Sequence, residues 1–90
     1  FGKMNKSINK IAWCTGGAQG FIDAAVKLKV DLYLSGEVSE RTPSVAKENG
    51  ITYISAGHHA TERYGVQSLC SHLCSKFKLQ HQYIEVDNSV

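Results

Sequence analysis

The sequence has a single proline, no long apolar run and little excess charge of either sign. Pro43 lies outside every segment with a strand pattern, so proline interrupts no strand. No apolar stretch approaches the roughly 18–20 residues that a membrane-spanning helix needs, and we expect no membrane contact. The formal charge of the 90 residues is only +2, whereas nucleic-acid-binding domains usually carry a basic stripe. We therefore expect no nucleic-acid partner.

Cysteine is also scarce, and the chain opens without a secretory signal pattern. Three cysteines are an odd number for a disulfide framework, so we expect reduced thiols and a cytoplasmic protein. The chain begins at Phe1, and nothing before Ile8 has the pattern of a strand or helix. We expect residues 1–9 to be unstructured, or the linker end of a missing upstream region. Residues 10–90 are then one α/β portion.

Short apolar runs alternate with longer amphipathic stretches along the chain. The runs predict four strands, at 10–14, 31–34, 51–55 and 82–86. Helical spacing, with Asn49-Gly50 as a stop signal, predicts three helices, at 20–29, 39–48 and 59–77. The last helix places four apolar residues on one face: Val66, Leu69, Leu73 and Phe77. The order βαβαβαβ predicts a mostly parallel sheet flanked by helices.

Small residues and glycine follow each of the first three predicted strands. The carboxyl ends of parallel strands share one edge of a sheet, which is where open α/β proteins bind ligands. Glycine there lets the backbone approach a ligand closely. We therefore expect a ligand site lined by residues of these turns: Thr15, Gly16, Gly17 and Glu37. Each glycine taken alone is also what a tight strand-to-helix turn requires.

The segment GHHATE at 57–62 carries the densest chemistry of the chain. If a helix begins at His58, then His58 and Glu62 lie four residues apart on one face. An imidazole nitrogen and a carboxylate so placed can bind a divalent cation. His59 is rotated about 100° away, which favours a contact with substrate or with a metal ligand. The pair also fits an ordinary polar helix start, with Glu62 near the helix dipole.

Two other patterns are weaker signals. The glycine-rich turn 15–20 fits the dinucleotide-binding pattern G-x-G-x-x-G only in part, because Thr15 replaces the first glycine. Cys70 and Cys74 would share one helix face, whereas His72 would point about 200° away from it. We interpret the two cysteines as small buried residues rather than zinc ligands.

Three motifs, taken together, carry a family resemblance. WCTGGAQGFID, LSGEVSE and AGHHATERYG occur in this order with compatible spacing. Together they resemble the carboxyl-terminal part of the GTP cyclohydrolase I type 2 homologue family, the YbgI-like dinuclear-metal proteins. The resemblance extends from about Lys10 to Val86. It implies that the chain is a fragment of a larger, two-lobed α/β protein.

The resemblance further implies a toroidal homohexamer that holds two divalent metals facing an internal cavity. In such proteins the late strand-to-helix motif supplies one histidine and one glutamate, which match His58 and Glu62. The other ligands, a histidine pair and an aspartate, come from the amino-terminal part and have no match here. An imidazole and carboxylate ligand set leaves zinc, manganese, iron and nickel open as the metal.

Two functions follow as hypotheses. The first is a metal-dependent hydrolase on a nucleotide-like small molecule, in which the metals activate water. His58 and Glu62 would hold metal, while Glu37 or His59 would handle protons or orient substrate. The alternative is a non-enzymatic metal-binding oligomer that serves as a scaffold or metal handler. We assign no catalytic residue from the sequence.

Overall fold

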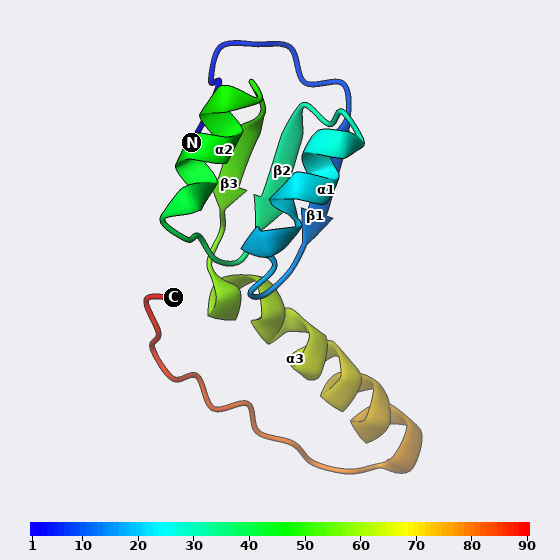
Figure 1. The fold of residues 1–90 in the computed structure, drawn as a ribbon. Coiled ribbons are helices and arrows are strands. Elements are labelled where there is room, and N and C mark those ends of the chain that lie inside the picture. The colour runs from blue at the N-terminus through cyan, green and yellow to red at the C-terminus, as the bar shows by residue number, and fades with distance from the viewer.

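Three of the predicted strands form one parallel sheet. In this computed structural model, which describes all 90 residues, they are β1 (Ile11–Cys14), β2 (Leu32–Ser35) and β3 (Thr52–Ser55). β2 lies between the other two strands and pairs in parallel with both, as the arrows in Figure 1 show. The prediction of an α/β fold with a parallel sheet is confirmed.

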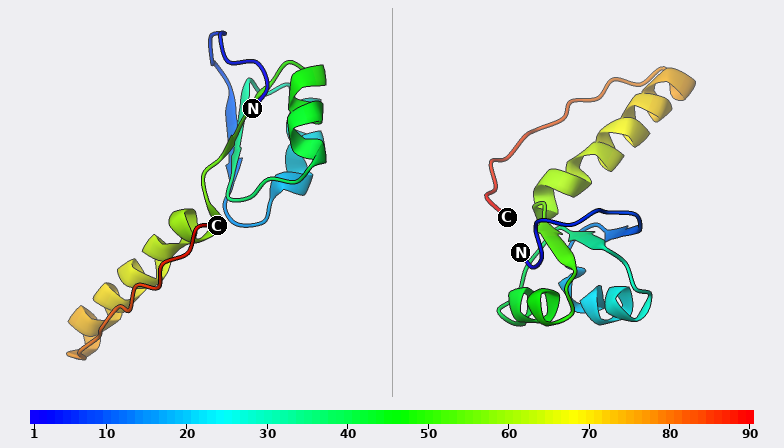
Figure 2. Two further views of the ribbon diagram at one scale, coloured as in Figure 1. Left: turned by 90° about the vertical axis from the view of Figure 1, so that its left-hand side faces the viewer. Right: turned by 90° about the horizontal axis from the view of Figure 1, so that it is seen from above.

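Two helical crossovers cover one face of this sheet. A short 3-10 turn, η1 (Gln19–Phe21), leads into α1 (Ile22–Lys27), and α2 (Arg41–Glu48) joins β2 to β3. Right-handed crossovers between successive neighbouring strands place both helices on the same side, and Figure 2 shows them there. The predicted stop of α2 is also present, since Gly50 follows it with a φ of +63°.

The hydrophobic core lies between these helices and the sheet. It consists of Ile22, Ala25, Val30, Tyr33, Ala46, Ile51 and Tyr53. The rings of Tyr33 and Tyr53 meet edge to face, with centroids 5.6 Å apart. The Tyr33 hydroxyl donates to the carbonyl of Ala18 at 2.8 Å, and the Tyr53 hydroxyl donates to the carbonyl of Glu37. These two hydrogen bonds attach the loops after β1 and β2 to the core.

The opposite face of the sheet has no helix over it, and we call it the open sheet face. Its side chains include Ile11, Trp13 and Ile54, and Trp13 is 72% exposed. Parallel sheets in α/β proteins normally have both faces covered. The helices predicted to flank the sheet therefore flank it on one side only.

The longest helix, α3 (His58–Phe77), leaves the sheet instead of packing on it. Figure 1 shows it extending away from the carboxyl ends of the strands, and none of its residues is buried. Its apolar residues share a face as predicted, but all four are exposed: Val66, Leu69, Leu73 and Phe77. No helix here combines the length and the apolar character that crossing a bilayer requires.

The predicted fourth strand at 82–86 is wrong. Residues 79–90 form neither helix nor strand, and both figures show this tail running back beside α3. A helix of 20 residues is about 30 Å long, so α3 carries the chain far from the sheet before the tail begins. The alternating apolar residues Ile84 and Val86 consequently stay exposed, and the sheet keeps three strands.

The first residues are also more ordered than expected. Gly2 forms an antiparallel bridge with Thr52, and the Tyr53 amide donates to the carbonyl of Phe1 at 2.9 Å. The free edge of β3 offers unpaired backbone groups, which this segment satisfies. The expectation of an unstructured amino terminus therefore does not hold for residues 1–3, although residues 4–9 lie in no strand or helix.

Candidate functional site

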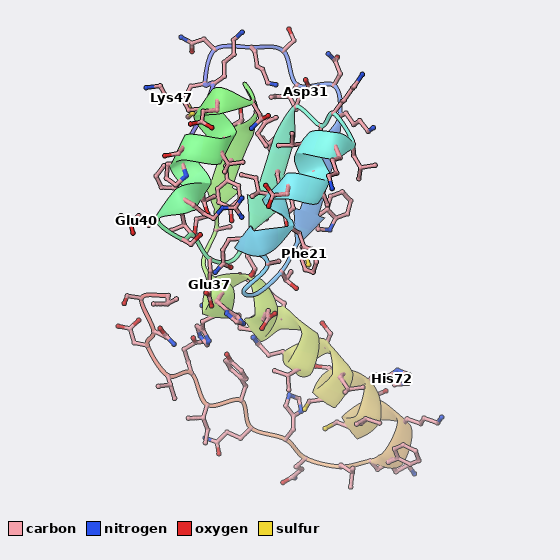
Figure 3. The ribbon with its side chains drawn as sticks, viewed as in Figure 1. Phe21, Asp31, Glu37, Glu40, Lys47 and His72 are labelled. Carbon is pink, nitrogen blue, oxygen red and sulfur yellow. The ribbon has the colours of Figure 1, made fainter.

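The loops that follow the three strands meet at one edge of the sheet. The Gly36 amide donates to the carbonyl of Gly16, and the Gly57 amide donates to the carbonyl of Gly36, each at 3.0 Å. These two bonds link the turn after β1 to the turn after β2, and that turn to the start of α3. Figure 3 labels Glu37 at this meeting point, beside the first turn of α3.

Two glycines allow the loops to approach so closely. A Cβ on Gly16, whose φ is +70°, would lie 2.6 Å from Glu62 Oε1 and 3.1 Å from His58 Nε2. A Cβ on Gly36 would lie 2.7 Å from the carbonyl oxygen of Gly16. Only glycine avoids both clashes. The backbone of the β1 turn therefore borders the side chains at the start of α3 directly.

His58 and Glu62 come together on the first turn of α3. Their Nε2 and Oε2 atoms lie 3.0 Å apart, and the two side chains are 40% and 47% exposed. Helical spacing alone explains this contact, because residues four apart are neighbours on a helix surface. The structure thus places the pair as the sequence analysis expected.

Glu37 forms a hydrogen bond with the other ring nitrogen of His58. Its Oε1 lies 2.6 Å from Nδ1, so a proton on Nδ1 is donated to Glu37 and Nε2 faces the Glu62 carboxylate. The pKa of His58 is raised above its ordinary value, mainly by the hydrogen bond to Glu37. Desolvation lowers this pKa in part, and the negative charges of Glu62 and Glu37 raise it further. The position between Nε2 and the Glu62 carboxylate therefore favours a cation, either a proton or a metal.

The donor set fits part of a metal site. His58 Nε2 and Glu62 Oε2 lie 3.0 Å apart, and an imidazole nitrogen and a carboxylate oxygen are both donors that would suit a divalent metal. No group of three or more His, Cys, Asp or Glu side chains converges anywhere in the chain. The chain therefore offers two donors, fewer than the three or four that zinc takes from protein.

The remaining predicted site residues lie around this pair at different distances. Gly17 borders Glu37, since a Cβ built on it would lie 3.5 Å from Glu37 Oε1. Thr15 is exposed on the same turn. His59 turns away from the pair, and its Nε2 lies 2.8 Å from Glu85 Oε1 in the tail. The site is thus built from Gly16, Glu37, His58 and Glu62, with His59 beside it.

Sequence reasoning missed the contribution of the tail. The Glu85 carboxylate also lies 3.6 Å from Arg63, and its pKa is lowered mainly by the hydrogen bond from His59. A cavity of about 670 Å³ lies between α3 and the tail, and it is lined by His58, Glu62 and residues of the tail. Arg63 lies four residues after His59, a spacing that would have indicated a second pair on α3.

The cysteines on α3 differ from their predicted burial. Cys70 and Cys74 are half-buried, because α3 has no partner along most of its length. The Cys74 sulfur lies 3.1 Å from Nδ1 of His81 in the tail. Figure 3 shows His72 well along α3, far from the junction with the sheet.

The sequence matches known proteins along nearly its whole length. The family model Duf34/NIF3 (NGG1p interacting factor 3) matches residues 1–89. The chain is 55% identical over 87 residues to a GTP cyclohydrolase 1 type 2 homolog of Allochromatium vinosum, which covers 97% of this chain and 34% of that protein. It is 59% identical over 81 residues to one of Pseudomonas aeruginosa, covering 90% and 32%. The chain spans about a third of the length of these relatives.

Solved structures share the fold. A structure of protein ybgI, whose title gives its function as unknown, superposes with a TM-score of 0.84 at 45% identity, covering 89% of this chain and 32% of that one. TTHA1606 from Thermus thermophilus gives a TM-score of 0.76 at 28% identity, covering 87% and 31%. The resemblance drawn from the three motifs is confirmed. On the family match and these identities, the chain belongs to the Duf34/NIF3 family.

Proposed function

We propose that His58 and Glu62 supply two ligands of a divalent-metal site in the full-length protein, with the remaining ligands outside this chain. One observation carries the proposal: His58 Nε2 and the Glu62 carboxylate lie 3.0 Å apart while Glu37 binds Nδ1. Metal-bound histidines usually donate their second nitrogen to a carboxylate in this way. Glu37 therefore orients the His58 ring so that Nε2 faces the Glu62 carboxylate, where a metal would replace the proton.

We further propose that the metal site is hydrolytic and acts on a nucleotide-like small molecule. A bound divalent metal would lower the pKa of water and polarise a substrate oxygen. The cavity beside the pair holds about 670 Å³, within the usual range of small-molecule sites. The relatives' name, GTP cyclohydrolase 1 type 2 homolog, agrees with a nucleotide-like ligand.

Assembly and location are part of the same proposal. The open sheet face and the apolar face of α3 are exposed in this chain, and both need cover from the rest of the protein or from other copies. A toroidal homohexamer with two divalent metals per subunit, in the cytoplasm, would supply such cover. Zinc, manganese, iron and nickel all suit an imidazole and carboxylate pair.

Turnover by the full-length protein tests the hydrolytic function. The purified protein, loaded separately with each of these metals, is incubated with a panel of nucleotides and phosphorylated small molecules. We expect metal-dependent hydrolysis that Glu62→Ala abolishes and that Glu48→Ala, an exposed control on α2, leaves intact. Bound metal without turnover on any substrate would overturn the hydrolase and support the alternative, a metal-binding scaffold or metal handler.

A further inference from the structure

Two adjacent pairs of side chains line the cavity between α3 and the tail. His58 and Glu62 form the candidate metal pair, and His59 and Arg63 form a second pair one residue further along the helix. Both pairs have a spacing of four residues, so each occupies its own face, about 100° apart. The second pair carries two nitrogen donor groups and no carboxylate of its own.

The second pair already holds an oxyanion. Glu85 of the tail places its Oε1 2.8 Å from His59 Nε2 and 3.6 Å from Arg63 Nη1. Arginine presents several N–H donors in a planar fork that suits carboxylate and phosphate oxygens. The arrangement of these donors around one carboxylate oxygen defines where an oxyanion binds in the cavity.

The geometry of Arg63 does not depend on Glu85 alone. Its Nη2 donates to the Tyr64 hydroxyl at 3.2 Å, and its Cζ lies 5.1 Å from the centre of the Tyr64 ring. The tail that carries Glu85 has neither helix nor strand, so few backbone bonds hold it in place. Glu85 can therefore leave while Arg63 keeps a second anchor.

We propose that His59 and Arg63 form a binding subsite for the phosphate or carboxylate group of a small-molecule ligand, and that Glu85 occupies this subsite until the ligand displaces it. This proposal rests on the proposed function in one respect: the other end of the same ligand would reach His58 and Glu62. Val66, Ile84 and Val86 line the same cavity and would contact an apolar part of the ligand.

Anion binding to the full-length protein, stripped of metal by a chelator, tests the subsite. Inorganic phosphate and acetate are titrated separately by calorimetry against the wild type, Glu85→Gln and Arg63→Gln. Glu85→Gln removes the internal competitor, and we expect it to tighten binding by about fivefold or more. Arg63→Gln should abolish binding, and Arg63→Lys, which keeps the charge but loses the fork, should weaken it. The preferred anion identifies the ligand as a phosphate ester or a carboxylic acid.

A variant far from the cavity serves as the control. Glu48→Ala, exposed on α2, should bind the preferred anion as the wild type does, and because every protein is metal-free, a failure of the metal proposal leaves this result unaffected. Unchanged affinity in Glu85→Gln, or wild-type binding by a folded Arg63→Gln protein, would overturn the subsite. Absence of binding in every protein, Glu85→Gln included, would overturn it too. Circular dichroism establishes that each variant is folded.

Discussion

The chain divides into a sheet region, residues 1–57, and an arm, residues 58–90, that consists of α3 and the tail. Every buried residue belongs to the sheet region, and the arm contains none. The sheet region therefore has its own core, whereas the arm holds together through helix hydrogen bonds and a few ion pairs. The candidate site lies where they meet, with Gly16 and Glu37 from the sheet region and His58 and Glu62 from the arm. A stable scaffold thus positions groups on an element that has little packing of its own.

Truncating a buried side chain should reveal the largest difference in stability contribution between the two regions. Ile22→Ala removes a fully buried side chain of the sheet region, and we expect the free energy of unfolding to fall by about 2–5 kcal/mol. Leu69→Ala removes an exposed side chain of α3 and should change it by no more than about 0.5 kcal/mol. Urea unfolding of this chain measures both values. Equal losses would contradict the division into core and arm.

A methyl group at the junction should have the next largest effect. Gly16→Ala adds a Cβ at a φ of +70° and presses it against Glu62 and His58, so we expect a loss of about 1–3 kcal/mol in unfolding free energy. Gly20→Ala is the matched control, because a Cβ there meets nothing within 4 Å. If both variants unfold alike in urea, the close approach of the β1 turn to α3 is wrong.

An ionisable group of the sheet region, Asp31, should also make the free energy of unfolding depend on pH. Backbone bonds from Asn9 and Lys10, with a further bond from Lys6, hold the pKa of Asp31 below its ordinary value. A lowered pKa in the folded state stabilises the protein above the unfolded value, and this stability is lost as pH falls through the folded pKa.

Urea midpoints between neutral and acidic pH measure this dependence. Asp31→Asn should lower the midpoint at neutral pH and reduce its loss on acidification. Asp23→Asn, which breaks an exposed ion pair with Arg41, should change the midpoint little. A wild-type acid profile retained in Asp31→Asn would contradict the role of these bonds.

The smallest expected effect concerns His58, which links the two regions. Its raised pKa stabilises the fold fully below the unfolded value, and the stability is lost as pH rises through the folded pKa. Glu37→Gln removes the main cause, so the pKa of His58 should fall. An NMR titration of the His58 ring measures it, with Glu48→Gln as a control that leaves it unchanged. A raised pKa that persists without the Glu37 carboxylate would contradict the link.

Local features of the chain could be predicted from its sequence, whereas contacts between the sheet region and the arm, or within the arm through the tail, could not. Strand runs, glycine turns and helical spacing are local patterns, so they predicted β1 to β3 and the contact between His58 and Glu62. The strand predicted at 82–86 failed because alternation does not reveal whether a sheet edge lies within reach. The bond between Glu37 and His58 joins residues 21 apart in sequence, and the bond between His59 and Glu85 joins residues 26 apart. No spacing rule reports either, since both depend on how the loops and tail fold back.

Metal content is the most direct test of the central claim that His58 and Glu62 bind metal. The full-length wild type, His58→Ala/Glu62→Ala and the control His72→Ala/Glu48→Ala, whose residues are exposed and distant from the pair, are purified without added metal. Elemental analysis then gives the metal per subunit. We predict that wild type and control retain the same amount, near two, and that the first variant falls to about one or none. Equal metal in all three proteins would contradict the account.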